Sequence, residues 1–237
     1  MPKHGKKYQA AVKTVDRDRT YTPAEALALV KQNATAKFDE TVEVHLRTNL
    51  DPRQADQQIR GVVNMPAGTG KQVRILVFAE GDAERAARDA GADYTGSDDL
   101  IQKIQNENWL DFDVAIAVPQ VMSKVGKLGR ILGTRGLMPN PKAGTIVQPE
   151  DLARVIRETR QGRVEYRLDR TGNVHVPIGK ASFTVEQLLE NLSALTEAIM
   201  RAKPASVKGQ YIRRATLTST MGPGVRVELT QVVAPRG

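Results

Sequence analysis

The feature that most constrains this fold is a run of five alternating segments in the middle of the chain. The runs VRILVFA (73–79), ADYTG (92–96) and DVAIAV (113–118) have strand patterns, and residues 82–90 and 98–108 between them have helical patterns. The first and last runs are almost continuously apolar, which is typical of parallel strands buried on both faces. Strand, helix, strand, helix and strand in this order predict a doubly wound α/β unit, and a further helix is predicted at 121–133.

The residues before this unit have a different character. Thr22, Pro23 and Glu25 form a helix-start signal, in which Thr22 caps the helix and Glu25 completes a capping box. The segment ETVEVHLRTNL (40–50) alternates apolar and polar residues, so it predicts a strand with one buried face, and QIRGVVNM (58–65) predicts a second strand.

The residues after the unit are similar to those before it. A helix is expected at 150–160, and a second, long amphipathic helix at 184–202. The runs RVEYRL and NVHVPI flank Asp169-Arg170-Thr171-Gly172, which predicts an antiparallel hairpin. Two further strand patterns, YIRRATLTST and VRVELTQVV, are separated by MGPG and close the chain.

The first 65 residues would make a poor core alone, and the last 80 residues have the same antiparallel α/β character. We therefore expect an α/β protein of two domains. Residues 1–68 and 159–237 form one discontinuous domain with an antiparallel sheet, and residues 69–158 form an inserted, Rossmann-like domain. The chain would cross between them twice, near 66–70 and near 161–162, and such a double hinge predicts rigid-body domain motion.

Charge points to a polyanionic partner. The formal net charge is +8 and the pI is about 9.8. Ten acids lie between residues 80 and 113, whereas residues 114–149 have none and residues 201–237 have only Glu228. We therefore expect the acidic block at 80–113 to face solvent and to stay away from nucleic acid.

Several function classes are disfavoured. The chain has no cysteine, and His4, His45 and His175 do not have metal-ligand spacing, so we expect no metal and no thiol chemistry. No apolar run approaches the roughly 20 residues that span a bilayer, and the basic N-terminus lacks the apolar core of a secretory signal. Phosphate-binding, dinucleotide and nucleophile-elbow motifs are also missing, so we expect no cofactor and no small-molecule substrate.

Three segments are candidates for contact with RNA. In GKLGRILGTRGLMPNPKAGT (126–145), glycines allow close approach of the backbone to a polyanion, or they serve only tight turns. In TSTMGPG (218–224), hydroxyls and an exposed apolar tip suit RNA, or the segment is a plain hairpin turn. In AKFDETVEVH (36–45), Phe38 is either a core residue or an exposed contact to RNA. Glu43 either accepts a hydrogen bond from a base amine or a ribose hydroxyl, or orients a neighbouring lysine.

These segments carry a family resemblance. KFDETVEVH, GRILGTRGLMPNPKAGT, GKASF and TSTMGPGVRV together resemble the bacterial large-subunit ribosomal protein of the L-one family, over essentially the whole chain and in order. The resemblance implies a cytoplasmic, non-enzymatic protein of the large ribosomal subunit. It would bind the ribosomal RNA of the mobile stalk, assist release of deacylated tRNA from the exit site, and repress translation of its own messenger RNA.

The resemblance also implies site residues. The main RNA contacts would come from the discontinuous domain, at Lys37, Phe38, Thr41, Glu43, Arg170, Thr171, Thr218, Thr220, Met221 and Gly222. Secondary RNA or tRNA-side contacts would come from the glycine-rich loop of the inserted domain, at Lys127, Arg130, Arg135 and Lys142.

One residue departs from the family pattern. Thr134 stands where the family commonly has proline, which frees the backbone and restores an N–H in the glycine-rich loop. Two alternatives remain beside the stalk protein: an α/β enzyme with a phosphorylated substrate, and a dedicated regulator of messenger RNA.

Overall fold

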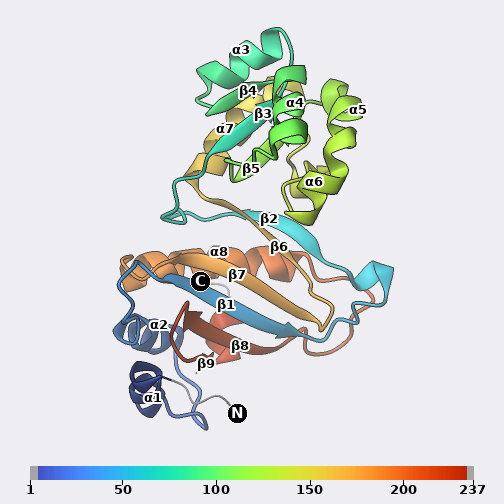
Figure 1. The fold of residues 1–237 in the computed structure, drawn as a ribbon. Coiled ribbons are helices and arrows are strands. Elements are labelled where there is room, and N and C mark those ends of the chain that lie inside the picture. Colours follow the sequence, from blue (N-terminus) through green and yellow to red (C-terminus); the bar gives the residue numbers. More distant parts are fainter. Residues whose placement is uncertain (1–4, 234–237) are drawn as a thin grey trace. The chain divides into compact units, whose positions relative to one another are not determined.

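A computed structural model describes residues 5–233 of the chain, in two compact units (Figure 1). One unit is formed by the residues up to Gly70 together with those from Gly162 onward, and the other by Lys71–Gln161. The molecule is therefore a mixed α/β protein, as the sequence predicted.

The first unit is built on a four-stranded antiparallel sheet in the order β7-β1-β8-β9. Its strands are β7 (Asn173–Lys180), β1 (Thr41–Thr48), β8 (Ile212–Ser219) and β9 (Val225–Val227). Buried and outward residues broadly alternate along the strands, and on β1 the buried residues are Val42, Val44, Leu46 and Thr48. The sheet therefore has one apolar face and one polar face.

Two helices cover the apolar face. They are α2 (Pro23–Gln32) and α8 (Val185–Arg201), and both begin with a capping box, at Thr22 and at Thr184. Helix α8 contributes a buried stripe at Leu188, Leu192, Leu195 and Ile199, which belongs to the same core cluster as the inward residues of the sheet. The sequence predicted both helices, because the cap and the apolar period are local signals.

Strands β2 (Arg60–Asn64) and β6 (Arg163–Arg167) form a separate antiparallel ribbon in the same unit. The predicted hairpin between β6 and β7 forms only beside its turn, since along their length β6 pairs with β2 and β7 pairs with β1. At the turn an antiparallel bridge joins Leu168 to Val174, and the N–H of Asp169 donates to the Asn173 carbonyl at 2.8 Å. The turn chemistry was read correctly, but the long-range partners of a strand are not encoded in its turn.

The second unit has a three-stranded parallel sheet in the order β4-β3-β5. Its strands are β3 (Ile75–Phe78), β4 (Tyr94–Gly96) and β5 (Val114–Ala117), and every residue of β3 is buried. Helices α3 (Asp82–Asp89), α4 (Asp98–Glu107) and α7 (Leu152–Gln161) contribute to its core. Short helices α5 (Met122–Val125) and α6 (Gly129–Thr134) follow β5.

Two terminal segments differ from the sequence expectation. Leu229–Val233, predicted as part of the last strand, forms helix α9, because the strand pairing of β9 ends at Val227. Lys6–Lys13 forms helix α1, which the sequence reading did not single out. Short 3-10 turns complete the elements, at Ala55–Gln57, Pro119–Val121, Gly126–Leu128, Pro141–Ala143 and Pro149–Asp151.

Candidate nucleic-acid interface

The tip of the β8–β9 connection is a compact turn that presents Met221 to solvent. The backbone N–H of Gly222 donates to the Ser219 carbonyl at 3.1 Å, and the Thr218 hydroxyl lies 3.0 Å from that carbonyl oxygen and 3.2 Å from that of Gly222. A Cβ at position 222 would lie 2.5 Å from the Ser219 hydroxyl, so a larger residue there would require the Ser219 side chain to move. The Met221 side chain is 62% exposed.

The loop before β1 presents a second apolar side chain beside a lysine. Phe38 is 57% exposed, and Lys37 next to it is also exposed. Within residues 5–233, Phe38 and Met221 are the two large hydrophobic side chains that remain exposed. Phe38 is therefore not a core residue, and exposed apolar groups of this kind commonly mark a binding surface.

A buried carboxylate joins these two segments. Glu40 is 1% exposed, and its two oxygens accept hydrogen bonds from the backbone N–H groups of Met221 (3.0 Å) and Ala36 (2.8 Å). The N–H of Thr41 also donates to the Thr220 hydroxyl at 3.0 Å. Burial opposes ionisation of Glu40, but hydrogen bonds to its carboxylate outweigh burial and lower its pKa.

Glu40 was missed by the sequence reading, although a signal for it was present. The alternation that buries Val42, Val44 and Leu46 also places position 40 on the inward face. An acid at an inward position needs hydrogen-bond partners, and backbone N–H groups supply them here. The carboxylate thus fixes the loop and the turn relative to each other.

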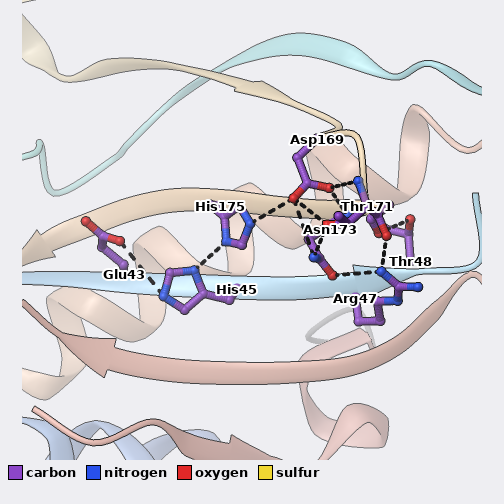
Figure 2. A network of polar contacts seen from close by, with 9 residues as sticks. Glu43, His45, Arg47, Thr48, Asp169, Thr171, Asn173 and His175 are labelled. Atoms are coloured by element: carbon purple, nitrogen blue, oxygen red, sulfur yellow. Dashed lines mark hydrogen bonds and ion pairs between the residues drawn. The ribbon is translucent and has the colours of Figure 1, made fainter. Parts of the chain in front are cut away.

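The other end of the polar face is organised by Asp169 (Figure 2). Its carboxylate accepts from the N–H groups of Thr171 (2.8 Å) and Asn173 (2.7 Å) and from the Thr171 hydroxyl (2.7 Å). These hydrogen bonds hold its pKa well below the ordinary value although burial acts in the opposite direction. The guanidinium of Arg47 donates to the Thr171 carbonyl, and Arg170 at the turn is exposed.

A row of polar side chains connects the two ends. On β1, Glu43 lies opposite Thr218, His45 opposite His175, and Arg47 opposite Arg214. The Nδ1 atoms of His45 and His175 are 2.7 Å apart, and Figure 2 shows the two rings pointing toward each other from neighbouring strands. Seven residues separate Thr41 from Thr48, so the row is roughly 20 Å long.

The structure thus brings the ten expected main contacts to one sheet. Eight of them gather where β1 begins and β8 ends: Lys37, Phe38, Thr41, Glu43, Thr218, Thr220, Met221 and Gly222. The other two, Arg170 and Thr171, lie at the far end of the same strands, where the N–H of Thr48 donates to the Gly172 carbonyl. We refer to this whole surface as the open face.

The first part of the glycine-rich segment of the second unit is helical, as the predicted helix at 121–133 requires. Residues 126–134 belong to this helical stretch, and Leu128 and Leu132 are fully buried. Gly126, Gly129 and Gly133 have no neighbour within 4 Å of an added Cβ, so these glycines do not serve a close approach within the chain. The four expected contact cations in this segment are exposed: Lys127, Arg130, Arg135 and Lys142.

Thr134 closes this helical segment. Its hydroxyl donates to the carbonyls of Ile131 at 3.0 Å and Arg130 at 3.2 Å. The residue that departs from the family pattern therefore satisfies backbone acceptors at the end of α6.

The acidic block is less open than expected. Several of its acids pair with cations of the same unit, including Asp113 with Lys71 (2.7 Å) and Glu80 with Lys124 (2.6 Å). Arg160 likewise pairs with Asp93 at 3.0 Å. The block is exposed, but much of its charge is neutralised locally.

Two further features are absent from residues 5–233. No group of three or more His, Cys, Asp or Glu side chains there could hold a metal ion. Every helix in this part of the chain is too short or too polar to traverse a bilayer.

Comparison with known proteins gives consistent matches. Residues 30–223 match the model of the ribosomal protein L1p/L10e family. The large ribosomal subunit protein uL1 of Chloroflexus aggregans is 66% identical over 98% of both chains, and that of Chloroflexus aurantiacus 65% over 96%. The same protein of Dehalococcoides mccartyi is 58% identical over 100% of both chains. The chain therefore belongs to the ribosomal protein L1p/L10e family, whose members are structural RNA-binding proteins of the ribosome and not enzymes.

Proposed function

We propose that the chain is a constituent of the large ribosomal subunit in the cytoplasm and binds the folded ribosomal RNA of the mobile stalk through the open face. The observation that carries this proposal is the pair of exposed apolar side chains, Phe38 and Met221, held beside hydroxyls and cations by the buried Glu40. The names of the similar proteins, each a large ribosomal subunit protein, support the same assignment.

Each end of the open face offers a different kind of contact. At one end, Phe38 and Met221 provide apolar surfaces against which an unstacked base or a ribose can pack, and Lys37 can neutralise a phosphate. The carboxylate of Glu43 can accept from a base amine or a 2′-hydroxyl. At the other end, Arg170 extends from a turn that Asp169 holds rigid. Two fixed ends roughly 20 Å apart suit a folded RNA better than a flexible single strand.

Two finer functions follow from the family resemblance and belong to the same proposal. The stalk protein assists release of deacylated tRNA from the exit site, and the exposed cations of residues 126–145 provide the secondary contacts. The open face also binds a similar RNA structure in the leader of its own messenger RNA and so represses translation.

The test is filter binding to a folded stalk-region ribosomal RNA fragment and to a scrambled control of equal length, across a salt series. Strong preference for the folded fragment supports the proposal, and we expect log K to fall by about 0.7 to 0.9 per phosphate contact for each unit of log salt. Equal and weak binding to both RNAs would overturn it and leave only generic adhesion of a basic protein.

Two further measurements separate the remaining alternatives. Translation in vitro from the protein's own leader should fall on addition of the purified protein, whereas an unrelated leader should not respond. An enzyme with a phosphorylated substrate would be stabilised by its ligand. We expect no thermal shift with nucleotides or sugar phosphates, and a clear shift would reopen that alternative.

A further inference from the structure

A groove runs across the middle of the open face, between its two ends. Its volume is about 520 Å³. It is lined by residues of the three adjacent strands β1, β7 and β8, namely His45, Arg47, Asn173, His175, Arg213, Arg214 and Thr216. None of these residues is among the expected RNA contacts, so the groove is unexplained by the proposed function.

The charges in the groove favour an anion. Arg47 donates a hydrogen bond to the Thr171 carbonyl, and Arg213 donates one to the Asn49 side chain. Arg214 is exposed and makes no ion pair or side-chain hydrogen bond within residues 5–233. A free guanidinium in a groove wide enough for a phosphodiester is suited to bidentate contact with its two free oxygens.

The facing acids do not cancel this charge. Glu43 lies 3.9 Å from His45, and Asp169 lies 3.4 Å from His175 while also serving the turn. Arg226 on β9 lies opposite Thr216 in the sheet and adds another cation beside the groove. The groove therefore has more cationic than anionic side chains around it.

The two histidines are arranged to accept one more proton. Their Nδ1 atoms face each other at 2.7 Å, while the Nε2 of His45 faces Glu43 and that of His175 faces Asp169. When both rings are neutral, the ring that donates from Nδ1 must turn an Nε2 lone pair toward its carboxylate. With one added proton, a hydrogen lies in each of the three contacts: between the two Nδ1 atoms, and between each Nε2 and its carboxylate. A second added proton would place two cations side by side, with ring centroids 4.9 Å apart.

In the free protein, protonation of His45 is disfavoured. Burial lowers the pKa of His45, the neighbouring His175 lowers it further, and Glu43 opposes both effects only in part. An anion in the groove would supply the missing stabilisation of the charged form.

We propose that this groove binds one phosphate of the RNA held by the open face, and that the His45–His175 pair takes up one proton when it does so. The inference rests on the proposed function and deepens it, because it makes RNA affinity depend on pH. No bond is made or broken other than the transfer of that proton from solvent.

The test measures affinity for the folded stalk-region fragment at pH 6, 7 and 8 at constant ionic strength. The wild type should bind about tenfold more tightly at pH 6 than at pH 8, since one linked proton changes affinity by at most tenfold per pH unit. The double variant His45→Gln and His175→Gln keeps hydrogen-bonding side chains without a titrating ring, and its affinity should be independent of pH. Calorimetry in two buffers of different ionisation enthalpy should report net proton uptake for the wild type only.

Arg214→Ala tests the phosphate contact itself. We expect weaker binding and a salt slope smaller by about 0.7 to 0.9, whereas the matched control Arg201→Ala, an exposed arginine on α8 paired only with Glu197, should leave both unchanged. If the double variant misfolds, the single variant His175→Gln, at the exposed ring, is measured in its place.

Three results would overturn the inference. They are the same pH dependence in wild type and variant, zero proton uptake, or equal behaviour of Arg214→Ala and Arg201→Ala. Any of these leaves the preference for folded RNA intact. Loss of that preference at every pH would instead remove the proposed function, and the inference would fall with it.

Discussion

Two segments of this chain combine glycine with exposed polar or basic residues, and they use their backbones differently. At 126–134 in the second unit, the backbone is helical and the cations simply extend into solvent from a buried leucine anchor. At Thr218–Gly222 in the first unit, the backbone turns sharply and is tied to a buried carboxylate on another segment. Charge alone attracts any polyanion, whereas a fixed arrangement of apolar, hydroxyl and charged groups can select one RNA.

Glu40→Ala should have the largest effect, on both the stability of the protein and its RNA affinity. It leaves the N–H groups of Met221 and Ala36 without their acceptor in a buried setting. Each unsatisfied group costs about 1 to 3 kcal/mol, so we expect about 2 to 4 kcal/mol less stability in urea unfolding. RNA affinity should fall more than tenfold, because the turn and the Phe38 loop lose their common anchor.

Two substitutions calibrate that result. Glu40→Gln keeps one acceptor oxygen and should lie between the wild type and Glu40→Ala in both measurements. Glu43→Gln, on the polar face of the same strand, should leave stability within about 0.5 kcal/mol of the wild type. An unchanged unfolding free energy in Glu40→Ala would show that the carboxylate does not hold the turn.

The next largest effect should separate the two segments directly. Met221→Ala removes an exposed apolar contact and Thr220→Ala removes the acceptor of the Thr41 N–H. We expect each to weaken binding of the stalk fragment by about 1 to 2 kcal/mol, or roughly tenfold. Lys127→Ala should change it less than threefold. Equal losses in filter binding would mean that the two units contribute alike.

The difference between these segments also shows what the sequence could predict. The capping box at Thr22, the amphipathic period of α8, the alternation of β1 and the apolar strand β3 are local patterns, and all formed as expected. The sequence did not predict that β6 pairs with β2. Which strands pair depends on packing between residues that are far apart in the chain. Tyr166 of β6 fits against Gly61 of β2, a complementarity visible only after folding.

The candidate site was predicted in a similarly uneven way. The exposed residues came from motifs that stand out, such as the Thr-Met-Gly turn. Of the residues that position them, Asp169 belongs to a recognisable turn motif, whereas Glu40 has no motif of its own, and its importance comes from hydrogen bonds to backbone groups in the folded chain. The helix at 126–134 lies almost wholly within the helix predicted at 121–133, and two buried leucines fix it although its glycines lower helix propensity.

A smaller effect is expected from removing all four cations of the second segment. The quadruple alanine variant of Lys127, Arg130, Arg135 and Lys142 should keep its preference for the folded stalk fragment over the scrambled control. We expect a change in affinity of less than about fivefold, because exposed charges act mainly through general electrostatics. Loss of the preference would show that this segment takes part in recognition.

The last prediction concerns acid stability and does not involve RNA affinity. Asp113 in the second unit is close to Lys71 and Arg74, and although burial acts to raise its pKa, these contacts lower it from 3.8 to about 2. A lowered pKa means that the unfolded chain binds the proton more readily. Stability from this group is therefore complete above about pH 4 and is lost as the pH falls toward 2.

Asp113→Asn should accordingly cost about 1 to 2 kcal/mol at pH 7, after allowance for solvent screening, and almost nothing near pH 2. Urea unfolding of wild type and variant across this range measures the difference. Asp111→Asn is the matched control, since Asp111 is more exposed and contacts Arg74 alone. If the two variants lose equal stability at every pH, the network around Asp113 contributes no more than an ordinary surface ion pair, and the acid sensitivity of the second unit has another source.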